Sequence, residues 1–289
     1  MKNIVIILRQ QLYRLFLLLL GVISLYVIST TFLFASFNVS SDSMYPELRT
    51  NEKIVVFKPT IGGRLFNPIS AIRGKEMDVY RMWGMREIRR NDVVVFNYPY
   101  KEWNRWNHIT MNLKRYYVKR CIGLPGDSIY CRDGIYRVLG TNCMLGNLIM
   151  QNDLQEAAYS IFPRPSYIED CALGWDISNW GPIYVPQKGD MIEINNSNYN
   201  LYKKMIEWEG GYCINSVSDE AFMSGRRRIK YRFKHSYFFM AGDNAPQSID
   251  SRFWGLVPDI FIVGKVAFVI GSNGMSSKSA IKSFFRTLE

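Results

Sequence analysis

Histidine is almost missing from this chain: among 289 residues only His108 and His235 occur. A histidine-rich metal site is therefore not expected, and a serine–histidine–aspartate triad has few histidines to draw on. The cysteines do not suggest a metal site either, because the sequence contains no CxxC pair. The base of any hydrolytic site would have to be a lysine or a carboxylate.

Cysteine is scarce as well, and its count of five is odd. At most part of this set can be paired, and the sequence leaves open which pair would form a disulfide. The cysteines are Cys121, Cys131, Cys143, Cys171 and Cys213.

Long hydrophobic runs are absent except near the N-terminus. The uncharged run at 15–37 holds about 23 residues, or about 34 Å of helix, which is enough to cross a hydrocarbon core of about 30 Å. The residues after the run are mixed in charge, whereas those before it are basic: Lys2, Arg9 and Arg14. The positive-inside rule then predicts a short cytoplasmic N-terminus (1–14), a transmembrane anchor (15–37) and an extracytoplasmic remainder. A cleaved secretory signal is the competing interpretation, which the length of the run disfavours.

The net charge of +11 suits an anionic partner, either lipid or nucleic acid. No helix-turn-helix, zinc-finger or RNA-binding signature accompanies this charge, and a protein tethered to a membrane meets lipid headgroups first. We therefore expect membrane phospholipid as a partner and no nucleic acid.

After the hydrophobic run the pattern turns to short apolar, β-branched segments bounded by turn residues, which is typical of buried strands. Helical periodicity is weak and confined to 154–160 and 200–209. The strands are expected at 54–57, 93–96, 116–122, 191–194, 237–241 and 260–270. The sequence therefore predicts a mostly-β protein.

The middle of the chain is richer in loops and polar residues than the strands on either side. We interpret it as a second subdomain inserted at 131–228 between two parts of a β body, 38–130 and 229–275. A short basic tail follows at 276–289.

Two residues could supply hydrolytic chemistry without histidine. Ser43 stands a few residues beyond the hydrophobic run, and Lys119 lies within a predicted strand. A serine hydroxyl needs a base to accept its proton, and a lysine can act as that base when burial lowers its pKa by several units. Each residue alone is a weak signal, because most strand lysines are surface residues.

Their neighbours make the pattern specific. SDSMYPEL at 41–48, NDVVVF at 91–96, KRCIGLPGD at 119–127, GDN at 242–244 and SIDSRFWGLVP at 248–258 resemble, in order, the conserved segments of bacterial signal peptidase I. IVGK at 262–265 resembles the segment near the family's C-terminal end. The resemblance covers the β body on both sides of the insertion.

The resemblance implies an antiparallel β catalytic domain, a serine–lysine dyad and no cofactor or metal. Ser43 would be the nucleophile and Lys119 the general base. Ser41 matches the serine that helps stabilise the oxyanion, and Ser248 matches the serine that orients the lysine. The pair Asp250 and Arg252 matches residues that brace the site.

The same resemblance implies the substrate and its location. Signal peptides of exported preproteins would bind as an extended strand with small side chains before the cleaved bond, at the extracytoplasmic (periplasmic) face of the inner membrane. The secretion translocon is a further candidate partner. The residues expected to line the substrate site are Phe37, Val39, Met44, Leu48, Tyr117 and Val118, although plain core packing is the alternative, above all for Leu48.

Three positions depart from the family's pattern. Asp42 replaces a common glycine, Glu47 replaces a threonine, and Ala245 replaces an arginine. A carboxylate at Asp42 would raise the pKa of the lysine if it approached, which would oppose the role of the lysine as a base.

Three other functions compete with a signal peptidase. A catalytically silent relative would bind signal peptides without cleaving them, but both dyad residues are present. A self-cleaving repressor would need a DNA-binding N-terminus, which the apolar run replaces. A cysteine enzyme using Cys121 or Cys213 would lack a nearby histidine motif.

Overall fold

The computed structural model describes residues 2–66, 79–103, 105–154, 166–171, 174–210, 229–271 and 286–288. Two parts of the chain discussed above are not described by the structure. Cys213 lies outside the described ranges, and so does most of the basic tail at 276–289. The expected helix at 154–160 lies outside them beyond Leu154.

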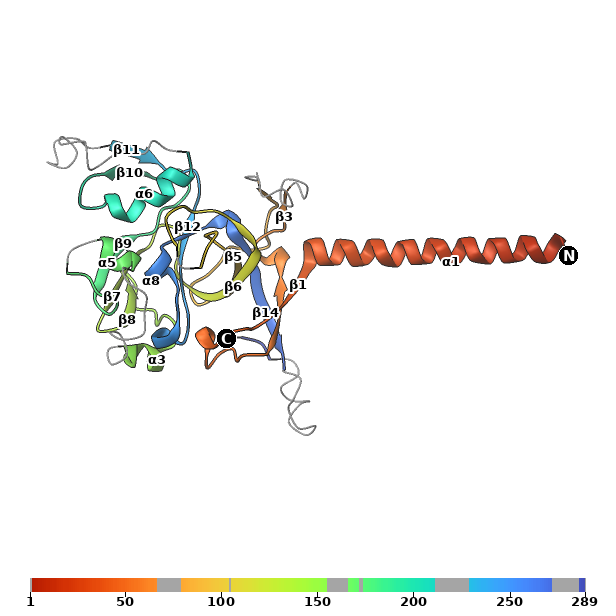
Figure 1. Cartoon of the computed structure of the whole chain (residues 1–289), viewed down its shortest axis with the longest axis horizontal. Coiled ribbons are helices and arrows are strands. Elements are labelled where there is room, and N and C mark those ends of the chain that lie inside the picture. The colour runs from red at the N-terminus through yellow and green to blue at the C-terminus, as the bar shows by residue number, and fades with distance from the viewer. Residues whose placement is uncertain are drawn as a thin grey trace.

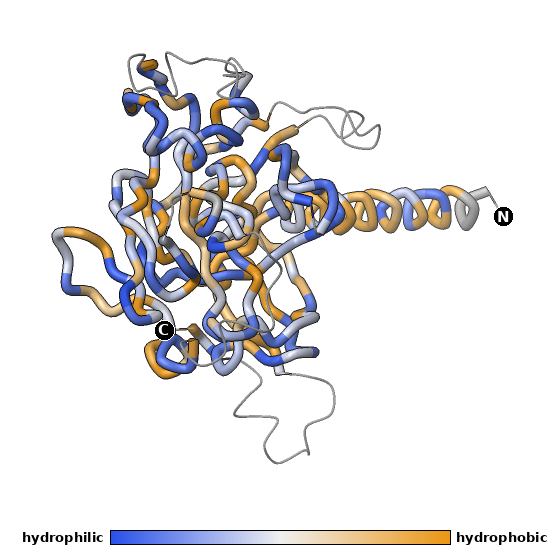
Figure 2. Tube along the Cα trace, turned by 60° about the vertical axis from the view of Figure 1, so that its left-hand side comes forward, coloured by the Kyte–Doolittle hydropathy of each residue, from blue (hydrophilic) through white to orange (hydrophobic). Residues whose placement is uncertain are grey.

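One long helix projects alone from a β-rich body (Figure 1). It is α1 (Lys2–Ile28), and it continues as a π-helical turn, Ser29–Leu33. The segment Ile6–Leu33 is long and apolar enough to cross a membrane. Figure 2 shows that most of the helix is hydrophobic, with hydrophilic residues confined to the part nearer its N-terminal end.

The helical part ends earlier than the run at 15–37 suggested. Residues 34–38 form strand β1 (Phe34–Asn38) instead, because their backbone pairs with β2 (Lys53–Phe57) in antiparallel register. Lys58 stabilises this junction by donating hydrogen bonds to two carbonyls at the end of the helix, those of Thr30 at 2.6 Å and Thr31 at 3.0 Å. A cation at a helix C-terminus also compensates the negative end of the helix dipole.

The body is built on a seven-stranded antiparallel sheet in the order β1-β2-β14-β5-β6-β12-β13, which confirms the predicted mostly-β class. The central strand β5 (Val93–Tyr98) is buried at every position, and this explains its unbroken apolar sequence. The other strands are β6 (Asn112–Gly123), β12 (Tyr237–Ala241), β13 (Val257–Pro258) and β14 (Ile262–Ile270).

Most of the smaller elements lie beside this sheet on the side away from α1, whereas the short strand β3 (Arg64–Leu65) lies on the side of α1 (Figure 1). A three-stranded sheet has the order β8-β7-β9, and two strand pairs are formed by β10 with β11 and β3 with β4. The strands are β3 (Arg64–Leu65), β4 (Tyr80–Arg81), β7 (Ser128–Arg132), β8 (Ile135–Val138), β9 (Trp180–Tyr184), β10 (Met191–Ile194) and β11 (Ile229–Arg232). The short helices are α3 (Leu148–Asn152), α5 (Tyr167–Cys171), α6 (Tyr199–Trp208) and α8 (Ser251–Trp254).

The largest hydrophobic core joins the main sheet to the middle of the chain. Trp180 of β9 stacks on Phe239 of β12 with ring centroids 5.1 Å apart, and both side chains are buried. The division at 131–228 therefore remains a prediction about the sequence, since the described residues on both sides of it share one core.

A second, smaller core lies where β1, β2, β5 and β14 meet. Its members are mostly valines and isoleucines of these strands, joined by Val39, Met44 and Leu48 from the segment after β1. This core supports the loop that carries Ser43.

Candidate active site

Ser43 lies on a short 3₁₀ turn, Asp42–Met44, in the loop between β1 and β2. Its side chain is partly exposed, whereas the neighbouring Met44 is completely buried below it. Asn244 attaches this turn to the loop after β12: its backbone N–H donates to the carbonyl of Ser43 at 3.2 Å, and its side-chain amide donates to the carbonyl of Asp42 at 3.0 Å. The nucleophile candidate is thus held at its backbone and left open at its side chain.

Lys119 lies on β6, opposite Val94 of β5, and only 1% of its surface is exposed. Burial lowers the pKa of Lys119 to about 8, because the ammonium form loses its hydration. The charges of Asp250 and Asp243 oppose this shift, and that of Arg252 adds to it. A pKa near 8 leaves a substantial neutral fraction at mildly alkaline pH.

The two candidates are 76 residues apart in sequence and in direct contact in space. The Nζ of Lys119 is 2.5 Å from the Oγ of Ser43, a short hydrogen bond. The Oγ of Ser41 lies 3.3 Å from the Oγ of Ser43 on the exposed side. The fold therefore brings three of the predicted site residues together.

Ser248 lies on the turn behind Ser43 and is completely buried. Its Oγ has no hydrogen-bond partner among the described residues. The space around it is tight: a Cβ on Gly242 would lie 2.2 Å from this Oγ and 2.4 Å from the carbonyl oxygen of Ser43. Gly242 is therefore required for the close approach of the two turns, and Ser248 presents an unpaired polar atom beside Ser43.

Asp250 and Arg252 form a fully buried, bidentate ion pair, with both N–O distances at 2.8 Å. Burial alone would raise the pKa of Asp250, but the charge and hydrogen bonds of Arg252 outweigh that effect and lower it. Arg252 also donates to the carbonyl oxygens of Ala245 at 2.9 Å and Ser248 at 3.1 Å. The pair thus holds the turn that carries Ser248.

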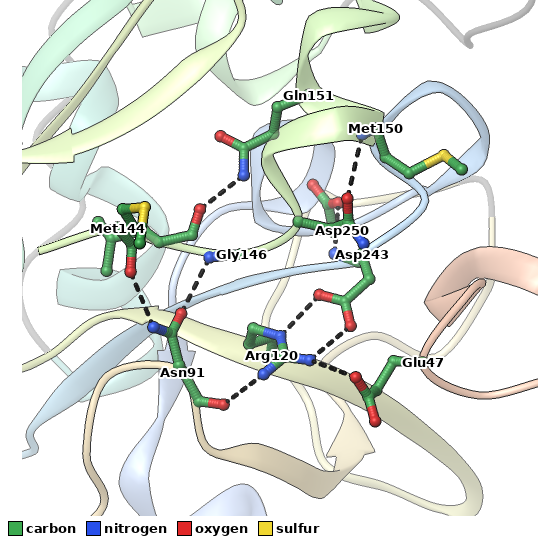
Figure 3. A network of polar contacts seen from close by, with 12 residues as sticks. Glu47, Asn91, Arg120, Met144, Gly146, Met150, Gln151, Asp243 and Asp250 are labelled. Carbon is green, nitrogen blue, oxygen red and sulfur yellow. Dashed lines mark hydrogen bonds and ion pairs between the residues drawn. The ribbon is translucent and has the colours of Figure 1, made fainter. Parts of the chain in front are cut away.

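A second polar network, which the sequence did not predict, surrounds Arg120, the neighbour of Lys119 on β6 (Figure 3). Arg120 makes a bidentate pair with Asp243, both distances being 2.7 Å, and contacts Glu47 at 3.5 Å. It also donates to the carbonyl of Asn91 at 2.8 Å. Arg120 and Asp243 stand within the KRCIGLPGD and GDN segments, so their positions were visible in the sequence but their partnership was not.

A groove of about 420 Å³ leads to Ser43 between β1 and the first half of β6. Four of the residues expected at the substrate site line it together with Ser41, namely Phe37, Val39, Tyr117 and Val118. Phe37 and Tyr116 approach across it with ring centroids 4.8 Å apart.

Met44 and Leu48, which were also expected at the substrate site, are not among the residues that line this groove. Both are completely buried in the second core, beneath the turn that carries Ser43. Burial of these apolar side chains is favourable and attaches the turn to the sheet. The core-packing alternative raised for Leu48 describes both residues.

Comparison with known proteins places the chain in a family. The sequence profile of the family described as "Signal peptidase, peptidase S26" matches residues 10–271. The chain belongs to this family. It is therefore a signal peptide-cleaving peptidase.

Curated relatives agree with this assignment. The signal peptidase I of Buchnera aphidicola subsp. Baizongia pistaciae is 27% identical over 280 residues, covering 90% of this chain and 77% of that protein. The signal peptidase I of Aquifex aeolicus is 24% identical over 269 residues, covering 92% and 85%. A solved signal peptidase I from Enterococcus faecalis aligns with 63% of this chain and 97% of its own at 19% identity, with a TM-score of 0.28, and the assignment does not depend on it.

The structure explains two departures from the signal peptidase pattern. The carboxylate of Asp42 accepts a hydrogen bond from the hydroxyl of Thr50 at 2.6 Å, and it is not among the charges that shift the pKa of Lys119. At Ala245 no side chain is needed to brace the loop, because Arg252 binds the backbone carbonyl there.

Three of the described cysteines, Cys121, Cys131 and Cys143, are free thiols. Burial raises the pKa of Cys121 well above its usual value, so its thiol stays protonated and is a poor nucleophile. The structure therefore offers no support for a cysteine enzyme based on Cys121.

Proposed function

We propose that this signal peptidase cleaves its substrates with a Ser43–Lys119 dyad through an acyl-enzyme. Neutral Lys119 takes the proton of the Ser43 hydroxyl as the oxygen attacks the carbonyl carbon of the bond to be cleaved. The resulting ammonium then gives that proton to the nitrogen of the leaving amine, and the C–N bond breaks. In deacylation, Lys119 takes a proton from water as it attacks the ester, and the Ser43 oxygen leaves with a proton from the lysine.

The observation that carries this proposal is the contact between a buried lysine and a partly exposed serine. The 2.5 Å distance between Nζ and Oγ suits direct proton transfer. The burial that lowers the pKa of Lys119 to about 8 supplies the neutral amine. An ordinary lysine, with a pKa near 10.4, would be almost entirely protonated at neutral pH.

Three groups would support the reaction around the dyad. The Ser41 hydroxyl and the backbone N–H of Ser43 would donate to the oxyanion that forms in each step. The unpaired Oγ of Ser248 would orient the lysine amine as the proton moves. The Asp250–Arg252 pair would brace the turn that carries Ser248.

The groove supports binding of the signal peptide as an added strand. β1 is an edge strand of the sheet, and β6 pairs with β12 only from Arg120 onward within the described residues. The facing backbone edges therefore have groups that an extended peptide could bind. Phe37, Val39, Tyr117 and Val118 would restrict the side chains just before the cleaved bond to small ones.

We further propose that α1 anchors the enzyme in the inner membrane with the N-terminus in the cytoplasm and the active site on the periplasmic side. The basic residues Arg9 and Arg14 and the apolar span support this orientation. Membrane phospholipid would surround the helix, and the secretion translocon would be a transient partner. Protease added outside spheroplasts should digest the body after β1, and protection of the body would contradict this orientation.

The decisive experiment is cleavage of a purified preprotein by alanine variants. Ser43→Ala and Lys119→Ala should each lower kcat by at least about a thousandfold, because a dyad acts as a unit. Ser197→Ala, on an exposed serine outside the groove, and Lys230→Ala, on an exposed strand lysine, are matched controls that should cleave normally.

The alternative is a relative that binds signal peptides without cleaving them. Wild-type enzyme that binds the preprotein but releases no mature product would favour it. Normal cleavage by either dyad variant would instead remove the dyad from the mechanism while leaving the family assignment intact.

A further inference from the structure

The C-terminal residues 286–288 lie against the loop that carries Ser43, although the two segments are far apart in the sequence (Figure 1). Arg286 pairs with Val269 near the end of β14: the backbone N–H of Val269 donates to the carbonyl of Arg286 at 2.8 Å, and the reverse bond is 3.1 Å. These two bonds fix the backbone of Arg286 to the main sheet.

The side chain of Arg286 reaches from there to the Ser43 loop. Its guanidinium donates to the backbone carbonyl of Glu47 at 2.5 Å and also contacts the carboxylates of Glu47 at 3.4 Å and Glu52 at 3.3 Å. One cation thus binds two points of the short segment between Ser43 and β2. Glu47 is the residue that replaces the family's threonine, and here its carboxylate lies between Arg286 and Arg120.

Leu288 continues this contact with apolar packing. It is partly buried against the second core, which also contains Met44 and Leu48. Met44 directly follows the nucleophile candidate, so Leu288 packs on the same small core that supports Ser43 from below.

We propose that Arg286 and Leu288 form a C-terminal clamp that holds Ser43 at the reacting distance from Lys119. Arg286 is then a positioning residue, acting on Ser43 through Glu47 and Glu52. The proposal rests on the dyad mechanism, because the clamp matters only if Ser43 must stay in place beside Lys119.

Physical reasoning separates this clamp from an ordinary stabilising contact. The side chain of Arg286 is 39% exposed, and ion pairs of that kind add little to the free energy of unfolding. The rate is more sensitive, since a displacement of about 1 Å between reacting groups can cost about a hundredfold. The clamp should therefore be visible in kcat and nearly invisible in Tm.

The test uses the full chain, reconstituted with phospholipid, and a purified preprotein substrate. Arg286→Ala should lower kcat by about tenfold with KM unchanged, because the groove is intact while Ser43 is less well placed. Arg286→Lys should recover part of the loss, since an ammonium can still bind the Glu47 carbonyl. Tm should shift by less than about 3 °C in both variants.

Arg49→Ala is the matched control, since Arg49 is an exposed arginine of the same loop. No hydrogen bond or ion pair of its side chain is found among the described residues, so the variant should retain the wild-type kcat. Glu47→Gln combined with Arg286→Ala should lose little more than Arg286→Ala alone, because the Glu47 carboxylate is one of the groups through which Arg286 acts.

Wild-type kcat in Arg286→Ala would overturn the clamp, as would an equal loss in Arg49→Ala or a loss that appears only as a higher KM. Ser43→Ala is measured in parallel to separate the two proposals. If Ser43→Ala cleaves normally, the dyad itself fails; if Ser43→Ala is inactive while Arg286→Ala is unaffected, only the clamp fails.

Discussion

The two halves of the site are held in opposite ways. Lys119 stands on a strand of the main sheet, paired with β5, and is almost completely buried. Ser43 stands on a loop at the edge of the same sheet, partly exposed and held through its backbone by Asn244. The base belongs to the core, and the nucleophile belongs to the surface.

This difference follows from what each group must do. A lysine becomes a useful base only when burial lowers its pKa, so it needs an interior position. A serine that attacks a peptide must be open to the groove, so it cannot be buried. The surroundings of Lys119 are therefore fixed by packing and a buried ion pair. The loop of Ser43 is held by the buried Met44 and Leu48 below it and by a few hydrogen bonds from distant segments.

The largest effect is expected on the buried side, where Arg252→Ala breaks the pair with Asp250. Removing one partner of a fully buried ion pair leaves the other charge uncompensated and costs about 3–5 kcal/mol of stability. Chemical denaturation should show this loss. Arg105→Ala is the control, because its pair with Glu102 is 73% and 50% exposed and should contribute less than about 1 kcal/mol. Equal losses of stability in the two variants would contradict the conclusion that the buried Asp250–Arg252 pair stabilises the surroundings of Lys119.

The pH dependence of cleavage tests the pKa of Lys119 itself. The amine must be neutral to act as a base, so kcat/KM should rise with pH through an apparent pKa of about 8 and level off above it. Between pH 7 and pH 9 the rise should be about tenfold. A rate that increases as the pH falls below neutrality would exclude the lysine as the base.

The charge of Asp250 raises the pKa of Lys119, so a substitution of Asp250 should shift the pH profile of kcat/KM. Asp250→Asn should shift the rising limb toward lower pH, because a carboxylate that favours the ammonium form is removed. The shift is read from the pH at half-maximal kcat/KM, in the temperature range where the variant is folded. An unchanged or alkaline shift would mean that Asp250 does not act on the lysine in this way.

On the loop side, Asn244→Ala should reduce the rate without moving the profile. It removes the hydrogen bond to the carbonyl of Asp42, and we expect about a fivefold lower kcat because Ser43 is less well positioned. The apparent pKa should stay near that of the wild type, since Asn244 carries no charge. A shifted apparent pKa together with wild-type kcat would show instead that Asn244 acts on Lys119 rather than on the position of Ser43.

The smallest effect is expected for Asp42→Asn, next to the nucleophile. The carboxylate binds Thr50 and is not among the charges that act on Lys119, so kcat should change by less than about twofold. A clear acid shift of the pH profile would show instead that this departure from the family pattern tunes the base.

Local sequence pattern predicted much of the sheet. Val93–Phe96 forms a buried strand as its continuous β-branched run indicates, and Tyr237–Ala241 is strand β12 with the predicted bounds. The pattern gave the wrong bound where an uncharged segment is compatible with either a helix or a strand. Residues 34–37 continue the uncharged run of the helix before them, but Phe34–Asn38 forms strand β1 because its partner is β2.

The same limit applies to the site. Met44 and Leu48 are apolar and close to Ser43, which fits a groove wall and a core equally well until the packing is known. Asn244 was visible only as part of the GDN segment, and its bonds to the Ser43 turn depend on an approach between segments about two hundred residues apart. No pattern in the sequence around Arg286 indicates a role at the site.

The sequence by itself determined the chemistry available: a membrane-length apolar segment, a serine beyond it, a strand lysine, and ordered segments that resemble signal peptidase I. Only the tertiary structure decided how these groups work together. It buries Lys119, which sets its pKa, and it sets the 2.5 Å contact with Ser43. Burial and distance arise from segments that meet only when the sheet closes, so no local stretch of sequence contains them.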